Sequence, residues 1–255
     1  MKSSDIIVSL IITSTITPFK STNVVLQDPK IRANQYFNSF RYALDNYPVN
    51  KIVLCENSDY DLSQFSDLSL NKNPRHIACE FLTQNDIDRN AYQNIGAYEM
   101  DMLLFAFENS KYLTDSNFVL KLTGRHYSPS VPQLVSFLQR NPRLSILSNL
   151  TCGLSYSDSR CFAGSPEFFI NYLFPLKHLF ISEENIWFEN ILARAINRAV
   201  GDGLIWSLPP RPVIIIGQSG SKGLSYRTDI IYNLLRFTRH KMKLIAYGQN
   251  PKLIK

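Results

Sequence analysis

The chain has 255 residues, a formal net charge of +6, 45% hydrophobic residues and 19% charged residues. This length suits one large α/β domain with a single core, and the composition is ordinary for a globular protein. No segment approaches the roughly 20 consecutive apolar residues that a membrane-spanning helix needs, so we expect none to cross a bilayer.

The first apolar stretch, residues 6–12, has the length of a signal-peptide core. It lacks the small-residue cleavage pattern of a secretory signal, and serine and threonine interrupt the run. We therefore expect residues 5–13 to form the first β-strand of a cytoplasmic protein.

Short apolar runs alternate with amphipathic stretches along the rest of the chain. This pattern predicts helices over residues 31–46, 98–112 and 131–140, a helix opened by Ser165, another from Ser182 to about Val200, and strands over residues 51–56, 77–81, 118–122, 144–150, 160–163, 204–206 and 213–216. Alternation of this kind is typical of a mostly parallel central sheet with helices on both faces, in one Rossmann-like α/β domain.

The positive charge is concentrated near the C-terminus. From Ser221 onward the chain contains eight Lys or Arg residues and one Asp, whereas residues 1–220 are nearly neutral. Residues 227–245 predict a basic amphipathic helix within a C-terminal extension, residues 221–255, that is packed on or continuous with the domain of residues 1–220. Such a helix can lie on an anionic membrane surface, or it can pack its apolar face on the core. The two roles are compatible.

Polar residues follow the predicted inner strands where each strand ends. Hydroxyl groups follow the first strand in residues 13–17, Glu56 and Asn57 end the second, and a Thr, Gly, Arg and His cluster follows residues 118–122. Ligands of open α/β sheets bind beyond the carboxyl ends of the strands. Because Arg125 offers a planar fork and Lys121 a mobile charge, the sequence predicts a site for the diphosphate of a nucleotide sugar.

The glycine-rich motifs of the common nucleotide-binding folds are absent from the sequence. Neither G-x-G-x-x-G nor G-x-x-x-x-G-K-[ST] occurs, which disfavours a dinucleotide-binding, methyltransferase or P-loop protein.

This layout resembles GT-A type glycosyltransferases over about residues 5–200. In that family the second strand ends in an acidic residue near the nucleotide base, as in Glu56-Asn57-Ser58. A central strand of the family usually ends in an Asp-x-Asp motif that binds a divalent metal, but the equivalent run here, FVLKLTGR at residues 118–125, has no acid. The resemblance therefore implies a metal-independent enzyme without a cofactor, in which Lys121 or Arg125 neutralises the diphosphate.

The KLTGR run and the upstream Gly96-Ala-Tyr-Glu99 resemble segments of bacterial and viral surface-polysaccharide glycosyltransferases. The acceptor implied by this resemblance is a glycan or a lipid-linked sugar. The residues implied for the donor site are Thr13, Thr15, Glu56, Asn57, Gly96, Glu99, Lys121, Thr123, Gly124 and Arg125.

Inverting members of the family carry a carboxylate base at the start of a late helix, and the segment from Ile181 to Glu189 resembles that region. The resemblance implies Glu184, Glu183 and Asp158 as catalytic candidates, with His126, Arg160 and Glu189 on the acceptor side. Each group also has a structural interpretation. Glu183 and Glu184 can complement a helix dipole, Asp158 can pair with Arg160, and Lys121 alternates away from its apolar neighbours toward a helix layer.

The sequence thus predicts a cytoplasmic glycosyltransferase, peripheral on the inner face of the membrane, that moves a sugar from a nucleotide donor. The alternatives are a module that binds nucleic acid or an anionic membrane, or another Rossmann-like transferase. We expect no nucleic-acid partner, because the neutral body and the strand-end cluster would then have no purpose.

Overall fold

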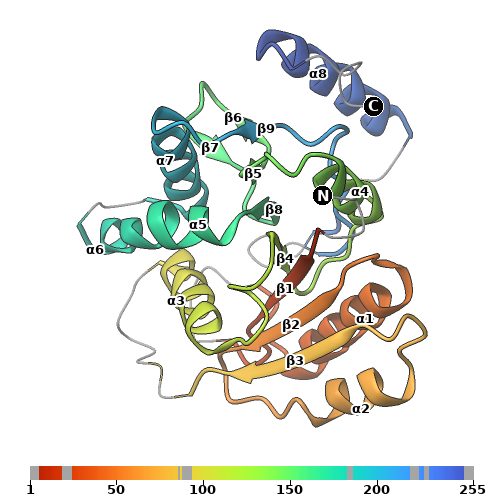
Figure 1. Cartoon of the computed structure of the whole chain (residues 1–255). Coiled ribbons are helices and arrows are strands. Elements are labelled where there is room, and N and C mark those ends of the chain that lie inside the picture. The colour runs from red at the N-terminus through yellow and green to blue at the C-terminus, as the bar shows by residue number, and fades with distance from the viewer. Residues whose placement is uncertain are drawn as a thin grey trace.

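The computed structural model describes residues 6–18, 25–85, 87, 94–182, 186–218, 224–226 and 230–249. At its centre, seven strands form one sheet in the order β3-β2-β1-β4-β8-β5-β9 (Figure 1). These strands are β1 Val8–Ser14, β2 Lys51–Glu56, β3 Ala78–Thr83, β4 Phe118–Thr123, β5 Ile146–Leu147, β8 Cys161–Gly164 and β9 Trp206–Ser207. A separate ribbon pairs β6 Leu150–Thr151 with β7 Tyr156–Ser157.

The sheet is mostly parallel. Strands β1 to β4 run in the same direction, β8 is antiparallel to both β4 and β5, and β9 is parallel to β5. In the β1 register, Thr13 lies opposite Thr123 of β4, and Ser14 lies opposite Glu56 of β2. The polar residues that end these three strands therefore meet at one edge, called the carboxyl edge below.

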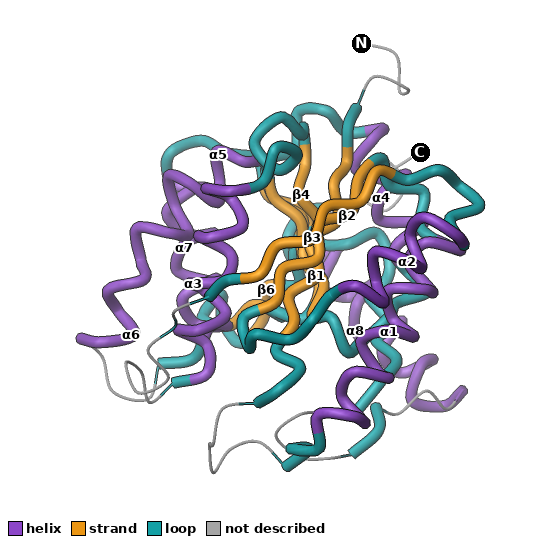
Figure 2. The backbone as a smooth tube through the Cα atoms, turned by 90° about the horizontal axis from the view of Figure 1, so that it is seen from below, coloured by secondary structure: helices purple, strands orange, loops and turns teal. Residues whose placement is uncertain are grey.

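Helices cover both faces of the sheet, as Figure 2 shows. One face packs against α1 Pro29–Asn46, α2 Ser63–Asn71 and α4 Val131–Arg140. The other packs against α3 Ile95–Asn109, the short α5 Pro166–Phe168 and α6 Leu179–Ser182, and α7 Phe188–Gly201. Between α5 and α6 the chain forms a π-helical turn, Phe169–Leu173, and a 3-10 turn, Phe174–His178.

The apolar strand sequences explain this two-layer cover. In β1, Leu10 and Ile12 join the core under α1 and α4, whereas Ile11 between them joins the core under α3 and α7. The side chains alternate between the two cores because successive side chains of a strand point to opposite faces. All three are fully buried, because helices cover both faces. The predicted fold class, a mostly parallel α/β sheet with helices on both faces, is confirmed.

Three local predictions need correction. The late helix does not begin at Ser182, which ends α6. It begins at Phe188, where the Asn190 side chain accepts a hydrogen bond from the Trp187 N–H (3.3 Å). The run 213–216 forms an isolated antiparallel bridge between Ile216 and Tyr127 rather than a strand. Helix α2 was not predicted, since its nine residues carry a short apolar pattern.

The predicted basic helix is present as α8, Ile230–Ala246. It lies at the rim of the molecule in Figure 1 and packs on the segment that follows β9. Within the described ranges, no helix is both long and apolar enough to cross a membrane.

Candidate functional site

A buried ion pair connects three elements at the carboxyl edge. Lys121 of β4 is fully buried and forms a salt bridge with Glu99 of α3. The Thr13 hydroxyl of β1 donates to the same Glu99 oxygen (3.2 Å). This cluster explains why Lys121 stands in an apolar strand, because a charge is tolerated in a core only when it is paired and hydrogen-bonded.

The ammonium of Lys121 has no hydrogen left for a phosphate. Besides Glu99, it donates to the Thr123 hydroxyl (2.9 Å) and to the Ser159 carbonyl (2.7 Å). A lysine has three donors, so these partners saturate it. The side chain points toward the α3 and α7 layer, with the Phe188 ring 5.9 Å away. The predicted contact of Lys121 with the diphosphate would therefore require one of these bonds to break. Lys121 holds the edge together, and Thr123 is one of its supports.

Glu56 is likewise saturated. Its fully buried carboxylate accepts hydrogen bonds from the backbone N–H groups of Ile16 (3.1 Å), Ser58 (2.7 Å) and Tyr60 (3.2 Å), and from the Ser58 hydroxyl. Glu56 therefore shapes the loops after β1 and β2. Its predicted direct contact with a ribose or base would require one of these bonds to break.

Several buried polar atoms at the carboxyl edge have no partner among the described residues. They are the Asn57 amide nitrogen after β2, the Gln84 amide oxygen after β3, and Arg125 Nη1 and His126 Nδ1 after β4. Unpaired buried polar groups are rare, and each calls for an explanation. A polar ligand at this edge would supply the missing partners.

Arg125 is the strongest of these signals. The residue is only 9% exposed, and its guanidinium forms no ion pair or hydrogen bond with any described residue. A buried cation without a counter-ion is costly unless a ligand neutralises it. The structure thus places Arg125 inward at the end of β4.

A second buried guanidinium, Arg32 of α1, lies near Arg125 and was missed by the sequence analysis. Its donors go to neutral oxygens, the carbonyls of Thr15 (2.9 Å), Ile16 (3.2 Å) and Leu26 (3.2 Å). Burial lowers the pKa of Arg32, Tyr36 opposes this effect, and the charge of Arg125 adds to it. No carboxylate pairs with Arg32 among the described residues, so the edge holds two arginine charges without salt-bridge partners. An arginine inside an amphipathic helix carries no sequence signal for this role.

Gly124 allows the backbone to pass close to β1. A Cβ atom at this position would stand 2.6 Å from the Thr13 carbonyl oxygen and 2.8 Å from the Tyr36 ring. The Gly124 N–H donates to that same carbonyl (2.9 Å). Glycine is therefore required here, because the backbone passes too close to β1 and Tyr36 to leave room for a Cβ atom.

His126 forms part of the wall rather than a free surface group. Its Nε2 donates to the Gln218 carbonyl (3.2 Å), and burial, reinforced by nearby Arg125, Arg160 and Lys121, lowers the pKa of the imidazole to about 4. The ring is therefore neutral at pH 7, and its bare Nδ1 is an acceptor. The Tyr226 ring lies edge-on at 5.2 Å.

The loop before β8 contains an ion pair between Arg160 and Asp158. Arg160 donates to both oxygens of Asp158, at 2.8 and 2.6 Å, and its guanidinium lies 4.9 Å from the centre of the Tyr226 ring. Burial alone would raise the pKa of Asp158, but the hydrogen bonds and charge of Arg160 outweigh it and lower the pKa. A neutralised carboxylate is a weak base, which opposes the catalytic role predicted for Asp158.

Glu189 has no cation partner among the described residues. It lies in the first turn of α7, and its Oε1 accepts a hydrogen bond from the Ser159 hydroxyl (2.7 Å), its one hydrogen-bond partner among the described residues. Because the Ser159 carbonyl also accepts a hydrogen bond from Lys121, Ser159 links Glu189 to β4. Glu183 and Glu184 lie outside the described residues.

The remaining predicted positions line the same region. The Thr15 hydroxyl donates to the Asn57 side-chain oxygen (2.6 Å), which leaves the Asn57 nitrogen free for a ligand. Gly96 sits one turn before Glu99 on α3, and a Cβ there would lie 3.0 Å from the Phe180 ring and 3.1 Å from Phe188. Gly96 therefore lets helix α3 pack closely against these two side chains.

The acids of the edge are not grouped as metal ligands. Across the part of the chain that the structure describes, no cluster of three or more His, Cys, Asp or Glu side chains is arranged to hold a metal ion. Glu99 and Asp158 each face a cation, and Glu56 is occupied by four donors. The described residues of this edge thus do not fit a divalent metal.

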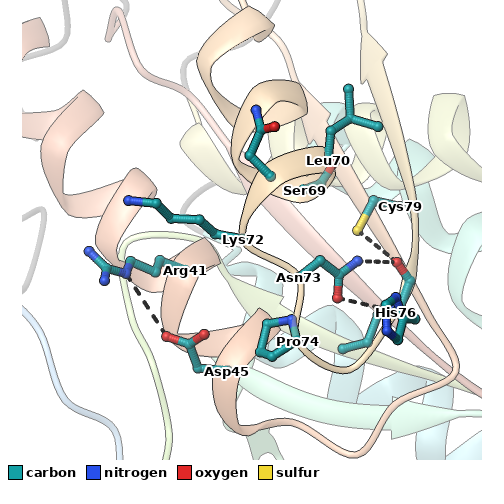
Figure 3. A pocket seen from close by; sticks show the side chains of 11 residues that line it. Arg41, Asp45, Ser69, Leu70, Lys72, Asn73, Pro74, His76 and Cys79 are labelled. Atoms are coloured by element: carbon teal, nitrogen blue, oxygen red, sulfur yellow. Dashed lines mark hydrogen bonds and ion pairs between the residues drawn. The ribbon is translucent and has the colours of Figure 1, made fainter.

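A hollow of about 740 Å³ lies at the opposite edge of the sheet (Figure 3). It is bounded by the ends of α1 and α2 and by the residues that lead into β3. Several of its polar groups have partners. Arg41 pairs with Asp45 (4.0 Å), and the Asn73 side chain bonds both backbone groups of Ile77. Since it lies at the amino ends of the strands and none of its lining residues has a buried polar atom without a partner, we do not assign it the function.

Comparison with known proteins places the fold. No family model and no curated protein sequence matches the chain. Among solved structures, the mannosyltransferase PcManGT from Pyrobaculum calidifontis, determined with GDP-Man and Mn2+, superposes with a TM-score of 0.51 and 10% identity over 95% of this chain and 66% of that chain. The inositol-1-phosphate CTP transferase from T. maritima gives a TM-score of 0.49 and 13% identity over 91% and 96% of the two chains. The first likeness shows a GT-A-like fold and nothing further, and the second carries no conclusion.

The role of Lys121 can be tested by Lys121→Met, which keeps the length of the side chain and removes its charge. We expect the free energy of unfolding to fall by about 3 kcal/mol, because Glu99 loses its cation and the Ser159 carbonyl its donor. Urea denaturation measures this change, and Lys72→Met, at an exposed lysine, is the control. Adding Glu99→Gln to Lys121→Met should recover part of the loss. Equal stability of Lys121→Met and the control would contradict the role.

Proposed function

We propose that the protein is a glycosyltransferase that moves a sugar from a nucleotide-sugar donor to a glycan or lipid-linked acceptor. The observation that carries this proposal is the unpaired, buried Arg125 at the carboxyl edge of a GT-A-like sheet. In such sheets this edge is where ligands bind. The similar mannosyltransferase was determined with a nucleotide sugar, GDP-Man.

The donor diphosphate would bind beside Arg125. A guanidinium matches two phosphate oxygens with parallel donors, and burial strengthens the attraction. Arg32 would add a second positive charge from behind, while its own donors stay on the loop after β1. The unpaired amide nitrogen of Asn57 and the amide oxygen of Gln84 would contact the nucleoside.

Glu189 would act as the base of an inverting transfer. Its carboxylate would take the proton of the acceptor hydroxyl as the oxygen of that hydroxyl bonds to the anomeric carbon of the sugar. The bond from that carbon to the diphosphate would break at the same time, and the nucleoside diphosphate would leave with the electron pair. Arg125 would stabilise the developing negative charge. Glu184, assigned this role from the sequence, is the competing candidate.

Metal independence is part of the proposal. The support is chemical, since the carboxylates Glu99 and Asp158 at this edge are each bound to a cation, and Arg125 offers the charge that a metal would otherwise supply. The mannosyltransferase neighbour contains Mn2+, which makes the difference testable.

Donor binding tests the role of Arg125. We expect Arg125→Met to weaken binding of the effective nucleotide sugar by about 10- to 100-fold, because a charged hydrogen-bond partner of phosphate is lost. A thermal-shift panel that includes UDP-glucose and GDP-mannose identifies the donor, and calorimetry measures the change. Arg143→Ala, at an exposed arginine, is the control.

The stability of the ligand-free Arg125→Met protein separates binding from structure. Because Arg125 has no partner among the described residues, its replacement by an apolar side chain of similar size should not lower the unfolding temperature. A marked drop in stability together with unchanged donor affinity would show a structural arginine and overturn the proposal. Release of pyrophosphate from a nucleoside triphosphate, without sugar transfer, would instead indicate a nucleotidyltransferase.

Turnover tests the base. We expect Glu189→Gln to lower kcat by about 100-fold or more with little change in donor affinity, since the amide cannot take a proton. Single-turnover release of nucleoside diphosphate is the measurement, and Glu167→Gln on α5 serves as control. A comparable loss in Glu184→Gln, with Glu189→Gln near normal, would assign the base to Glu184.

Metal removal tests whether positive side chains, rather than a metal ion, neutralise the diphosphate. We expect activity to persist after dialysis against EDTA, because positive side chains neutralise the leaving group. Loss of activity that Mn2+ restores would show that an ion performs this task.

A further inference from the structure

Helix α8 is attached to the body by one face. Nε2 of His240 donates to the Pro209 carbonyl (2.7 Å), Arg236 donates to the Val213 carbonyl (2.7 Å), and Leu244 is 2% exposed. Just beyond the helix, the Gln249 side-chain oxygen accepts from the Leu208 N–H (2.8 Å). These contacts fix the orientation of the helix on residues 208–213.

The opposite face of α8 is an apolar stripe open to solvent. Leu234, Leu235, Met242 and Ile245 are 67%, 53%, 58% and 65% exposed. At 3.6 residues per turn, these positions and Thr238 lie within one strip along the helix. Isolated exposed apolar residues are ordinary, but a continuous strip of large ones marks a contact surface.

Cations border this stripe on both sides. Helical geometry puts Arg239 next to Leu235 on one border and Lys241 next to Leu234 and Ile245 on the other, and both cations are exposed. Residues 230–249 contain no Asp or Glu. The helix therefore presents an apolar strip between two positive borders.

We infer that the stripe of α8 docks the protein on an anionic lipid surface. The apolar side chains would enter the boundary between headgroups and acyl chains, while Arg239 and Lys241 contact anionic headgroups. A second copy of this chain is disfavoured as the occupant, because pairing two such helices would bring their cations together with no carboxylate in either helix to offset them. The charge of α8 is therefore complementary to an anionic membrane and not to a second copy of the helix.

This surface lies near the proposed site, and the next step rests on the proposed function. Tyr226 contacts Arg160 and His126 at the carboxyl edge, and α8 begins at residue 230. Four residues span at most about 14 Å, so the start of α8 lies close to Tyr226 and therefore to the proposed site. Docking would bring the site within reach of an acceptor whose lipid anchor lies in the bilayer.

Co-sedimentation with vesicles tests the docking. We expect the full chain to bind vesicles of phosphatidylcholine and phosphatidylglycerol in a ratio of roughly three to one, and to bind pure phosphatidylcholine much less. The double variant R239Q/K241Q should weaken binding to the anionic vesicles by about 30-fold. The double variant K72Q/R75Q makes the same change of net charge on the far side of the molecule and should bind normally.

The apolar stripe has its own variant. L235Q/M242Q should abolish sedimentation even at low salt, because the inserted side chains are lost, whereas L70Q, at a leucine 78% exposed on α2, should have no effect. These residues already face solvent, so folding should not suffer, and circular dichroism checks this. Absent binding to anionic vesicles, or equal binding by all four variants, would overturn the inference. So would a concentration-dependent dimer in sedimentation velocity that L235Q/M242Q dissolves.

Donor binding in solution separates this inference from the proposed function. The α8 variants should bind the nucleotide sugar with unchanged affinity in calorimetry, since none of the substituted residues lies at the carboxyl edge. Vesicle binding without donor binding would support lipid docking through α8 and contradict the proposed glycosyltransferase function. Donor binding without vesicle binding would do the reverse.

Discussion

The arrangement of the carboxyl edge depends on the buried ammonium of Lys121. It pairs with Glu99 of α3, supports Thr123 at the end of β4 and holds the Ser159 carbonyl of the loop before β8. One charge thus connects a central strand, a helix and a loop that are separate in the sequence. Because a buried ion is stable only with all its donors satisfied, these partners are held in a single geometry. Glu189, linked through Ser159, takes its position from the same cluster.

Saturated and unsaturated groups have distinct places at this edge. Lys121, Glu56 and the Asp158–Arg160 pair have all or most of their hydrogen bonds, and they form the frame. Within the part of the chain that the structure describes, Arg125 and the side-chain nitrogen of Asn57 lack partners, and they stand within that frame. Burial makes an unsatisfied cation costly in the ligand-free protein, and the same burial strengthens its attraction for a phosphate group. The proposed function follows from this contrast rather than from the fold, which is shared by proteins with different activities.

The sheet and its edge could be predicted well from sequence, because apolar strand runs and the residues that end them are local patterns. The β2 boundaries, Lys51–Glu56, agree residue for residue with the prediction, and β1 and β4 differ by a few residues at most. Local reasoning failed where a boundary depended on packing. Helix α7 begins at Phe188 rather than after Ser182, and the apolar run 213–216 contributes an isolated bridge rather than a strand.

The sequence by itself determined the fold class, the absence of an acidic motif after β4, the polar strand ends and the basic C-terminal helix, since each is written in consecutive residues. Only the tertiary structure decided which partners the charged side chains bind. Lys121 and Ser159 are 38 residues apart, and Arg32 reaches Thr15 from a different element. Partners of this kind are chosen by distance in space, which no spacing along the chain reveals. That choice gave Lys121, one of the predicted phosphate ligands, three protein partners, and it left Arg125 without a partner among the described residues.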